Sequence, residues 1–354
     1  MKKVFYLFLC SIVSMLTSAQ VPQLTVEQHL EDYDFAVKYI EDNYSGFSFW
    51  VNDSTRSDYE MTKGRLRGEV ERGGRSGWDA ATAYTGWFGD FHMTVSVADP
   101  FAYFKRHFTF YQELMDNYHP EPVACKVTDK TFLIRFPSCR GRNPDMKWIK
   151  KSVKQYKKSH CENLIIDIRG NGGGADRFFY PYLRLVYDHR APVRSIEFRN
   201  TPQNMSYLKS QGWFPGIQQQ AIENPQLEYI PLHPMWHNYK RDKRVRKCAV
   251  IIDNSVASSG EEMVLEMRDA SDRVTIYGRD NTAGCLDFSN VSHATMPNCG
   301  VNFGVPLSRS QGLPETSVDK AGIAPDVRIT LPLPARLTDN IDEWVIWVAE
   351  QLEK

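Results

Sequence analysis

The chain has 354 residues, 42% hydrophobic and 12% aromatic, and its 43 Lys and Arg residues balance its 43 Asp and Glu residues. This composition excludes a disordered chain, because disorder goes with few apolar residues and a high net charge. The balanced charge gives no indication of nucleic acid or of an anionic membrane as a partner.

The N-terminus has the pattern of a secretory signal peptide. Lys2 and Lys3 precede an apolar stretch over residues 4–16, and small residues follow up to Ala19. Because this stretch is too short to span a bilayer, we expect residues 1–19 to be cleaved, with a short membrane anchor as the alternative. No later segment is apolar enough to cross a membrane. We therefore predict a periplasmic or extracellular protein with no membrane span after processing.

Residues 20–120 are predicted to form a mainly helical N-terminal domain. A capping-box pattern at Thr25 begins a helix that ends near Tyr44, with apolar residues at helical spacing between them. Two further helices are expected over residues 54–71 and 78–86.

From residue 121 to residue 354, strand-like and helical segments alternate, which predicts an α/β domain with a partly parallel sheet. The expected strands cover residues 122–127, 131–136, 164–168, 193–199, 247–253 and 274–277. The expected helices cover residues 145–158, 176–187 and 261–270, and a final amphipathic helix begins at about residue 339. Ligands of such sheets bind where strands end and helices begin.

Ser258 lies at one of these junctions, between the apolar residues 248–252 and the helix predicted over 261–270. A serine at a helix N-terminus has free backbone N–H groups beside its hydroxyl, and these groups can stabilise an oxyanion. A structural helix cap is the alternative explanation. Together with a glycine-rich loop at 170–175 and with His92, however, this serine indicates a serine hydrolase.

The glycine-rich loop has two interpretations. Its sequence, Gly-Asn-Gly-Gly-Gly-Ala over residues 170–175, satisfies the dinucleotide-binding pattern, and Asp188 lies where a ribose-binding acid would follow. A nucleotide-dependent enzyme is therefore one hypothesis, although predicted export and the mid-chain position argue against it. Consecutive glycines can equally turn backbone N–H groups toward the oxygen of a tetrahedral intermediate.

The segment Asp167-Ile-Arg-Gly-Asn-Gly-Gly-Gly174 resembles the DxRGNxGG signature of the tail-specific (C-terminal-processing) serine peptidases. Further segments that resemble this family, in the family's own order, are residues 131–138, 257–269, 278–284 and 322–327. The resemblance implies a ClpP/crotonase-like catalytic domain over residues 121–354, behind the helical domain. It also implies peptide-bond hydrolysis with a polypeptide as substrate, no nucleic acid partner and no cofactor or metal.

The resemblance implies that Ser258 is the nucleophile of an acyl-enzyme mechanism. The backbone N–H of Ser259 becomes one oxyanion donor, and that of Gly173 becomes the second, with Gly172 as the alternate. One branch of the family takes its general base from a Lys in the loop after the nucleophile. In this chain Cys285 occupies that position, and no lysine occurs between residues 268 and 319.

The other, tricorn-like branch takes its base from a His in a DGHT-like motif, which Gly89-Asp-Phe-His-Met-Thr94 resembles, with Phe91 in place of the usual Gly. The resemblance therefore implies that His92 is the general base, with a near-neutral pKa suited to proton transfer. Asp319 is the expected acid that orients it, and Glu315 is the alternative. A structural His92 is the competing explanation.

The departures at Phe91 and Cys285 keep a non-catalytic hypothesis open, in which the same cleft binds a peptide or an apolar ligand. Many relatives carry a PDZ domain after the base, but only about 40 residues separate His92 from the strand at 131, too few for one.

Six cysteines remain after processing, and two disulfides are predicted from their positions, Cys161 with Cys248 and Cys285 with Cys299. Free, buried cysteines are the alternative. His233 and His237 have the spacing of metal ligands, but Pro234 prevents a helical pair, so no metal site is predicted.

Overall fold

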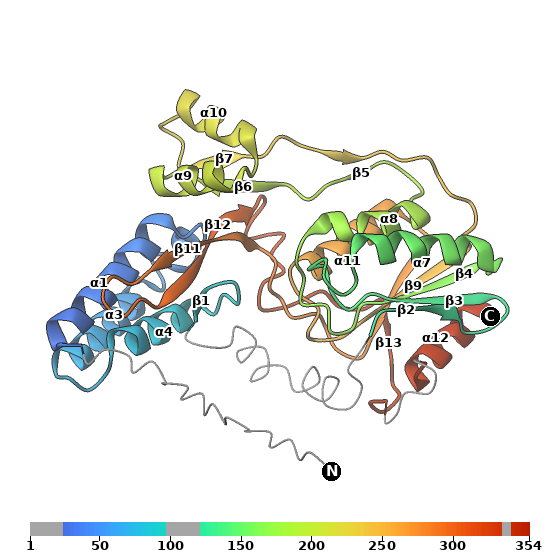
Figure 1. The fold of residues 1–354 in the computed structure, drawn as a ribbon, viewed down its shortest axis with the longest axis horizontal. Helices are drawn as coiled ribbons and strands as arrows, with labels where there is room; N and C mark the ends of the chain where they lie inside the picture. Colours follow the sequence, from blue (N-terminus) through green and yellow to red (C-terminus); the bar gives the residue numbers. More distant parts are fainter. Residues whose placement is uncertain (1–23, 97–120, 335–340) are drawn as a thin grey trace, which may run out of the picture.

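The computed structural model describes residues 24–96, 121–334 and 341–354, which form a helical lobe and an α/β lobe (Figure 1). The predicted signal peptide, the segment 97–120 and the start predicted for the last helix lie outside the described residues. No helix of the described chain is long and apolar enough to cross a bilayer.

The helices of the N-terminal lobe follow the predicted pattern. They are α1 (Val26–Asn43), α2 (Phe47–Trp50), α3 (Arg56–Glu71) and α4 (Gly77–Phe88). The capping box at Thr25 is confirmed, since its hydroxyl accepts the N–H of Gln28 and the Gln28 side chain accepts the N–H of Thr25. The last helix of this lobe, α4, ends at Gly89, whose φ of 64° suits a glycine. The turn at Gly89 directs the chain to His92.

The α/β lobe contains a six-stranded sheet in the order β13-β10-β9-β4-β3-β2, parallel except for β2. Its strands are β2 (Val123–Lys126), β3 (Thr131–Arg135), β4 (Asn163–Asp167), β9 (Lys247–Ile252), β10 (Val274–Gly278) and β13 (Val327–Arg328). Apart from the short β13, each matches a predicted strand, because uninterrupted apolar runs mark strands that are buried on both faces.

Helices cover both faces of this sheet (Figure 1). On one face lie α7 (Met146–Ser159), the short η1 (Asp176–Phe178), α8 (Tyr180–Val186) and α11 (Ser259–Ala270). On the other face lies α12 (Glu343–Glu353). Side-chain alternation along the strands separates the two cores: Ile134 packs toward α7 and α8, whereas Leu133 packs toward α12.

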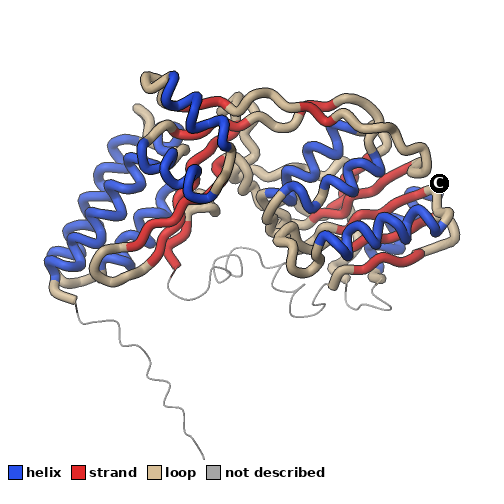
Figure 2. The backbone as a smooth tube through the Cα atoms, turned by 45° about the horizontal axis from the view of Figure 1, so that its top comes forward, coloured by secondary structure: helices blue, strands red, loops and turns tan. Residues whose placement is uncertain are grey.

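A second sheet joins the lobes in the order β1-β12-β6-β7, with β11 also paired to β12. Its strands are β1 (Thr94–Ser96), β6 (Ile196–Arg199), β7 (Tyr229–Pro231), β11 (Phe288–Thr295) and β12 (Asn302–Ser310). The segment that reaches this sheet and returns carries β5 (Ala191–Pro192), α9 (Pro202–Gln211), α10 (Pro215–Glu223) and β8 (Trp236–His237), and it bridges the lobes in Figure 2.

The hairpin of β11 and β12 was not predicted, and it belongs to the core of the helical lobe. Phe288, Phe303 and Val305 pack in one cluster with side chains of α1, α3 and α4. The helical lobe therefore takes part of its core from the region that the sequence assigned to the catalytic domain. The chain enters this hairpin directly after the loop that contains Cys285, so the hairpin connects that loop to the helical lobe.

The two predicted disulfides are wrong, since all six described cysteines are free. Cys248 pairs in register with Leu164, which places Cys161 roughly 10 Å farther along the neighbouring strand direction, beyond the reach of a disulfide. Cys285 lies in the loop before β11 and contacts His92, whereas Cys299 contacts Met296 in the β11–β12 turn.

Candidate active site

Ser258 lies in a strained turn between β9 and α11. Its φ of 54° and ψ of −125° fall where non-glycine residues are rare, at a cost of about 1–3 kcal/mol that surrounding structure must sustain. The Ser258 N–H donates to the carbonyl oxygen of Cys285 at 2.8 Å, and α11 begins at the next residue. The turn thus holds a serine hydroxyl at the N-terminus of a buried helix.

Asp253 connects this turn to the glycine loop. One of its carboxylate oxygens accepts the N–H and the hydroxyl of Ser255, and the other accepts the Gly170 N–H at 3.1 Å. Burial raises the pKa of Asp253 to about 6. Because Asp253 directly follows β9 and Gly170 follows β4, the register of these neighbouring strands brings the two loops together.

The glycine loop packs tightly against the nucleophile turn. A Cβ at Gly173 would lie 2.7 Å from the Cβ of Ser258 and 2.8 Å from the carbonyl oxygen of Ala257, and φ at Gly173 is 90°. Only glycine suits that backbone and that approach. Sequence reasoning placed Gly173 beside Ser258 through the family resemblance, and the structure brings the two together.

Of the two predicted oxyanion donors, one backbone N–H is free in the described part of the chain and the other is already hydrogen-bonded. Within the described residues, the backbone N–H of Ser259 donates to no protein acceptor, so it is available to a ligand. The N–H of Gly173 donates to Oδ1 of Asn171 at 3.0 Å, and the N–H of Gly172 donates to the carbonyl of Gly170 at 3.0 Å. Asn171 is fully buried and its amide also donates to Phe136, so it holds the loop firmly.

His92 lies in the turn after α4 and contacts Cys285. Its Nδ1 is 3.3 Å from the Cys285 Sγ, and its backbone N–H donates to Oδ1 of Asp90 at 2.8 Å. Burial, with a further contribution from the positive charge of Arg194, lowers the pKa of His92 to about 4. The imidazole is therefore neutral at physiological pH, as a proton acceptor must be, but its pKa lies below the near-neutral value that the sequence predicted, because the ring is buried.

Cys285 connects the two lobes of the site. Its carbonyl accepts the Ser258 N–H while its thiol faces His92, which lies 193 residues away in the sequence. No hydrogen bond joins the Ser258 hydroxyl to His92 anywhere in the described structure. Burial and the nearby carboxylates of Asp319 and Asp90 raise the pKa of the Cys285 thiol, so it stays protonated.

Glu261 supports the nucleophile turn from inside α11. Its Oε1 accepts from Thr282 Oγ1 at 2.5 Å and from the Gly284 N–H at 2.8 Å, while its Oε2 accepts the N–H groups of Cys285 and Ser258. Burial raises the pKa of Glu261 to about 7. Its contacts are all structural, so Glu261 fixes the loop 282–285 against Ser258.

Asp319 and Glu315 do not contact His92. Oδ1 of Asp319 accepts the backbone N–H groups of Leu286 and Asp287, at 2.6 and 2.7 Å, and Glu315 is exposed. Burial and the charges of Asp90 and Asp287 raise the pKa of Asp319 to about 8. Asp319 therefore fixes the backbone that follows Cys285, and it can act on the imidazole only through Cys285.

Two residues near the imidazole were missed by sequence reasoning. Asp90 accepts the His92 N–H and also the Tyr44 hydroxyl at 2.6 Å, and its place two residues before His92 was the available signal. Arg194, from the segment between β5 and β6, pairs with Glu262 of α11 at 2.5 Å. Nothing in the sequence around Arg194 marks it, because that strand reaches the site only through the tertiary fold.

The residues of the competing hypotheses have other partners. Asp188, the candidate ribose-binding acid, accepts from Ser271 and pairs with Arg273 and Arg241. His237 is buried with its Nε2 2.9 Å from Glu266, whereas His233 is exposed.

Comparison with known proteins identifies the family of this arrangement. A profile of peptidase family S41 matches residues 130–329, more than half of the chain. No curated protein sequence matches. Among solved structures, mature CPAF superposes with a TM-score of 0.65 at 13% identity over 93% of this chain and 96% of its own.

Two further structures give similar values. CPAF in complex with lactacystin has a TM-score of 0.63 at 12% identity, covering 86% of this chain and 94% of its own. A candidate peptidase from Parabacteroides merdae has a TM-score of 0.57 at 16% identity, covering 85% of this chain and 90% of its own. At these identities the likeness concerns the fold alone.

Proposed function

The chain belongs to peptidase family S41, a family of serine-type peptidases, and we propose that it cleaves polypeptides with Ser258 as nucleophile and His92 as general base. The observation that carries the proposal is the strained Ser258 turn, held at the N-terminus of α11 against Gly173. A structural cap has no need of this backbone strain or of a glycine loop packed on its Cβ. The family motifs also support a ClpP/crotonase-like catalytic domain, and residues 1–19 support export.

In the first step, the Ser258 oxygen attacks the carbonyl carbon of the substrate, and its proton passes to His92. The Ser259 N–H, aligned with the dipole of α11, stabilises the negative oxygen that forms. When the tetrahedral intermediate collapses, His92 returns the proton to the leaving amine, and an acyl-enzyme on Ser258 remains. Water, deprotonated by His92, then attacks this ester, and His92 gives the proton to the Ser258 oxygen as the carboxylic acid product leaves.

The second oxyanion donor requires a local rearrangement. The Gly173 N–H donates to Asn171 in the free chain, so it becomes available only when the substrate oxygen replaces the Asn171 side chain. The Ser258 hydroxyl must likewise rotate toward His92. Hydrogen bonds of free enzymes often reach their catalytic geometry only with substrate bound.

Cys285 and the backbone of Phe288 orient His92, since the imidazole contacts the Cys285 sulfur and also forms a hydrogen bond with the Phe288 backbone. In the proposed tautomer, Nδ1 carries the proton and faces the sulfur, which leaves Nε2 unprotonated and able to accept the serine proton. Asp90 holds the backbone of the same turn, and Asp319 holds the backbone just after Cys285. The carboxylates thus act on His92 through the chain, as positioning residues.

The test is mass spectrometry of an unfolded protein incubated with the native chain and with three variants. We expect fragments from the native chain, none from Ser258→Ala or His92→Ala, and fragments again from Ser259→Ala. Ser259→Ala is the matched control, because alanine removes a neighbouring hydroxyl and keeps the backbone N–H. Fragments that persist in Ser258→Ala would refute the assigned nucleophile.

A binding protein with a silent site is the second candidate function. It is favoured by the occupied Gly173 N–H and by the missing hydrogen bond between Ser258 and His92 within the described residues. A native chain that binds unfolded peptides, yields no fragments and is not labelled by a fluorophosphonate at Ser258 would establish this alternative.

A further inference from the structure

Helix α7 carries a continuous stripe of lysines on the outer surface of the α/β lobe. Its six lysines are all exposed, and they are Lys147, Lys150, Lys151, Lys154, Lys157 and Lys158. Successive members are one or three residues apart, which places them on one side of a helix. Ile149, Ser152 and Tyr156 are buried on the other side. The stripe spans roughly 17 Å of helix.

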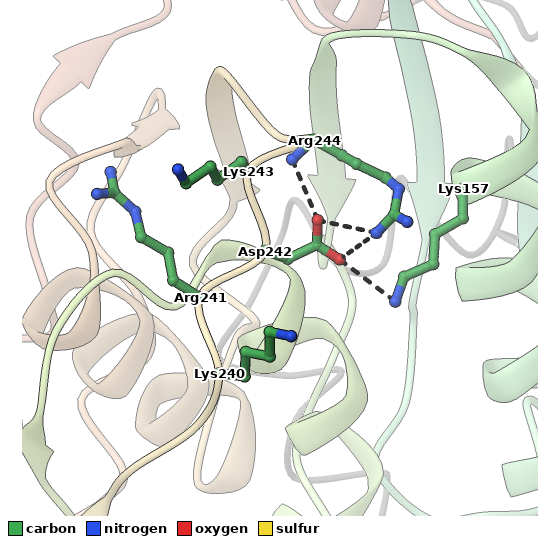
Figure 3. A pocket seen from close by; sticks show the side chains of 6 residues that line it. All are labelled: Lys157, Lys240, Arg241, Asp242, Lys243 and Arg244. Carbon is green, nitrogen blue, oxygen red and sulfur yellow. Dashed lines mark hydrogen bonds and ion pairs between the residues drawn. The ribbon is translucent and has the colours of Figure 1, made fainter.

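A second basic segment, residues 240–244, lies beside the C-terminal end of this stripe. Figure 3 shows Lys157 of α7 directed toward Asp242, with their charged atoms 3.3 Å apart. Together with Lys157, the five residues of the segment line an open cavity of about 650 Å³. We call the six lysines and residues 240–244 the lysine face.

Few acidic groups neutralise this surface. Asp242 pairs with Lys157 and Arg244, and Asp188 pairs with Arg241. Asp145 caps the start of α7, where it accepts the Trp148 N–H. Seven lysines of the face form no ion pair within residues 24–96, 121–334 and 341–354, and they are Lys147, Lys150, Lys151, Lys154, Lys158, Lys240 and Lys243.

Such a stripe works against the stability of the helix. Lys147 and Lys151, Lys150 and Lys154, and Lys154 and Lys158 are like charges four residues apart, a spacing that destabilises a helix. A helix face that only needs solvation interleaves acidic and basic residues, and α7 contains no acidic residue. The overall charge of zero hides this concentration.

We propose that the lysine face binds the surface of an anionic lipid bilayer. The lysine ammonium group is a compact, strongly hydrated charge, which suits attraction by the electrostatic potential of a whole anionic surface. Arginine instead binds individual phosphate groups through two hydrogen bonds at once. Binding of single-stranded nucleic acid uses exposed aromatic residues on which bases stack, and the aromatic side chains of α7, Trp148 and Tyr156, pack against the core. A rigid row of lysines therefore matches a planar, anionic partner.

The position of the lysine face is compatible with peptidase activity at a membrane. Residues 240–244 precede β9, whereas Ser258 follows the other end of that strand. The basic segment and the candidate site therefore lie at opposite ends of the sheet. A chain held through the lysine face would keep Ser258 accessible to soluble polypeptides.

The experiment measures sedimentation of the full chain with vesicles of phosphatidylcholine, with and without phosphatidylglycerol. We expect binding at least tenfold tighter to the anionic vesicles, weakened steeply by salt. The triple variant Lys150→Gln, Lys154→Gln, Lys158→Gln should lose on the order of a hundredfold in affinity. The neutral vesicles report any binding through the apolar N-terminus, which the substitutions do not touch.

The matched control removes three positive charges elsewhere, in Lys38→Gln, Arg72→Gln, Lys209→Gln, and should bind as the native chain does. Thermal unfolding of both variants shows whether they are folded, independently of any peptidase activity. Equal binding to both kinds of vesicle overturns the proposal, as does an equal loss in the control. The proposal is also overturned if inorganic phosphate releases the protein from the vesicles more strongly than another salt of the same ionic strength does. Binding to DNA or polyglutamate without binding to vesicles overturns it as well.

Discussion

Gly173→Ala tests whether the glycine loop is shaped around the nucleophile. The new methyl group would lie 2.7 Å from the Ser258 Cβ, about 0.7 Å inside the 3.4 Å at which ordinary van der Waals contact begins. The backbone φ of 90° adds roughly 1–3 kcal/mol of strain for a residue with a side chain. Overpacking of this degree costs about 1–3 kcal/mol more. We expect the free energy of unfolding to fall by roughly 2–6 kcal/mol.

Gly173→Ala should also impair catalysis in the molecules that remain folded. Relief of the contact moves Ser258 or the loop by several tenths of an ångström, and a misplacement of about 1 Å costs on the order of a hundredfold in rate. We therefore expect kcat/KM to fall by roughly tenfold to a hundredfold in the folded variant. Urea unfolding gives the stability, and peptide hydrolysis or the rate of fluorophosphonate labelling of Ser258 gives the reactivity.

Gly172→Ala is the matched control within the same loop. A Cβ at Gly172 meets no atom within 4 Å, and its φ is not positive. Alanine at such a position changes stability by less than about 1 kcal/mol, in the stabilising direction. The reasoning is refuted if Gly173→Ala keeps native stability and labelling, or if Gly172→Ala is impaired as severely.

Three further predictions concern the groups around the site. Cys285→Ala should lower kcat/KM by roughly tenfold and shift the pKa of His92 measured by NMR. Cys285→Ser should keep most of the native kcat/KM and a His92 pKa close to the native one. An unchanged His92 titration in Cys285→Ala would contradict the contact. Burial raises the pKa of Asp319 to about 8, so its contribution to stability is present at low pH and is lost as pH rises through 8. Asp319→Asn should therefore lose less stability than the native chain between pH 6 and pH 9 in urea titrations, and equal slopes would exclude this role. Asp342→Asn keeps an acceptor for the cap of α12 but leaves two buried arginines, Arg135 and Arg169, with Asp167 as the acidic partner of both. The free energy of unfolding should therefore fall by about 3–5 kcal/mol, and a loss below about 1 kcal/mol contradicts the expected cost of an uncompensated buried charge.

Local patterns in the sequence predicted most strands of the α/β lobe and the first helix of the helical lobe. The strands β3, β4 and β9 follow from apolar runs, and α1 follows from a capping box and apolar residues at helical spacing. Ser258 and the glycine loop were likewise found from their place between strand and helix. These features depend on residues close together in the chain, so they are visible without a structure.

The contacts of the site depended on the tertiary structure. The hairpin of β11 and β12 was not predicted, because β11 is mostly polar and only partly buried, and β12 contains Gly304 and Pro306, which are unusual inside a strand. Cys285 lies just before this hairpin and meets His92, 193 residues away in the sequence. Family resemblance assigned Asp319 to the imidazole, whereas the fold turns its carboxylate to the backbone of Leu286 and Asp287.

The lysine stripe illustrates the same division. Its spacing along α7 is written in the sequence, but its meeting with residues 240–244 required the fold. The sequence by itself determined which segments form strands and helices and which turns hold glycine and serine, because backbone preferences and hydrophobic periodicity act over a few residues. Only the tertiary structure decided which side chains meet at Ser258, because those contacts depend on how distant segments pack against one another.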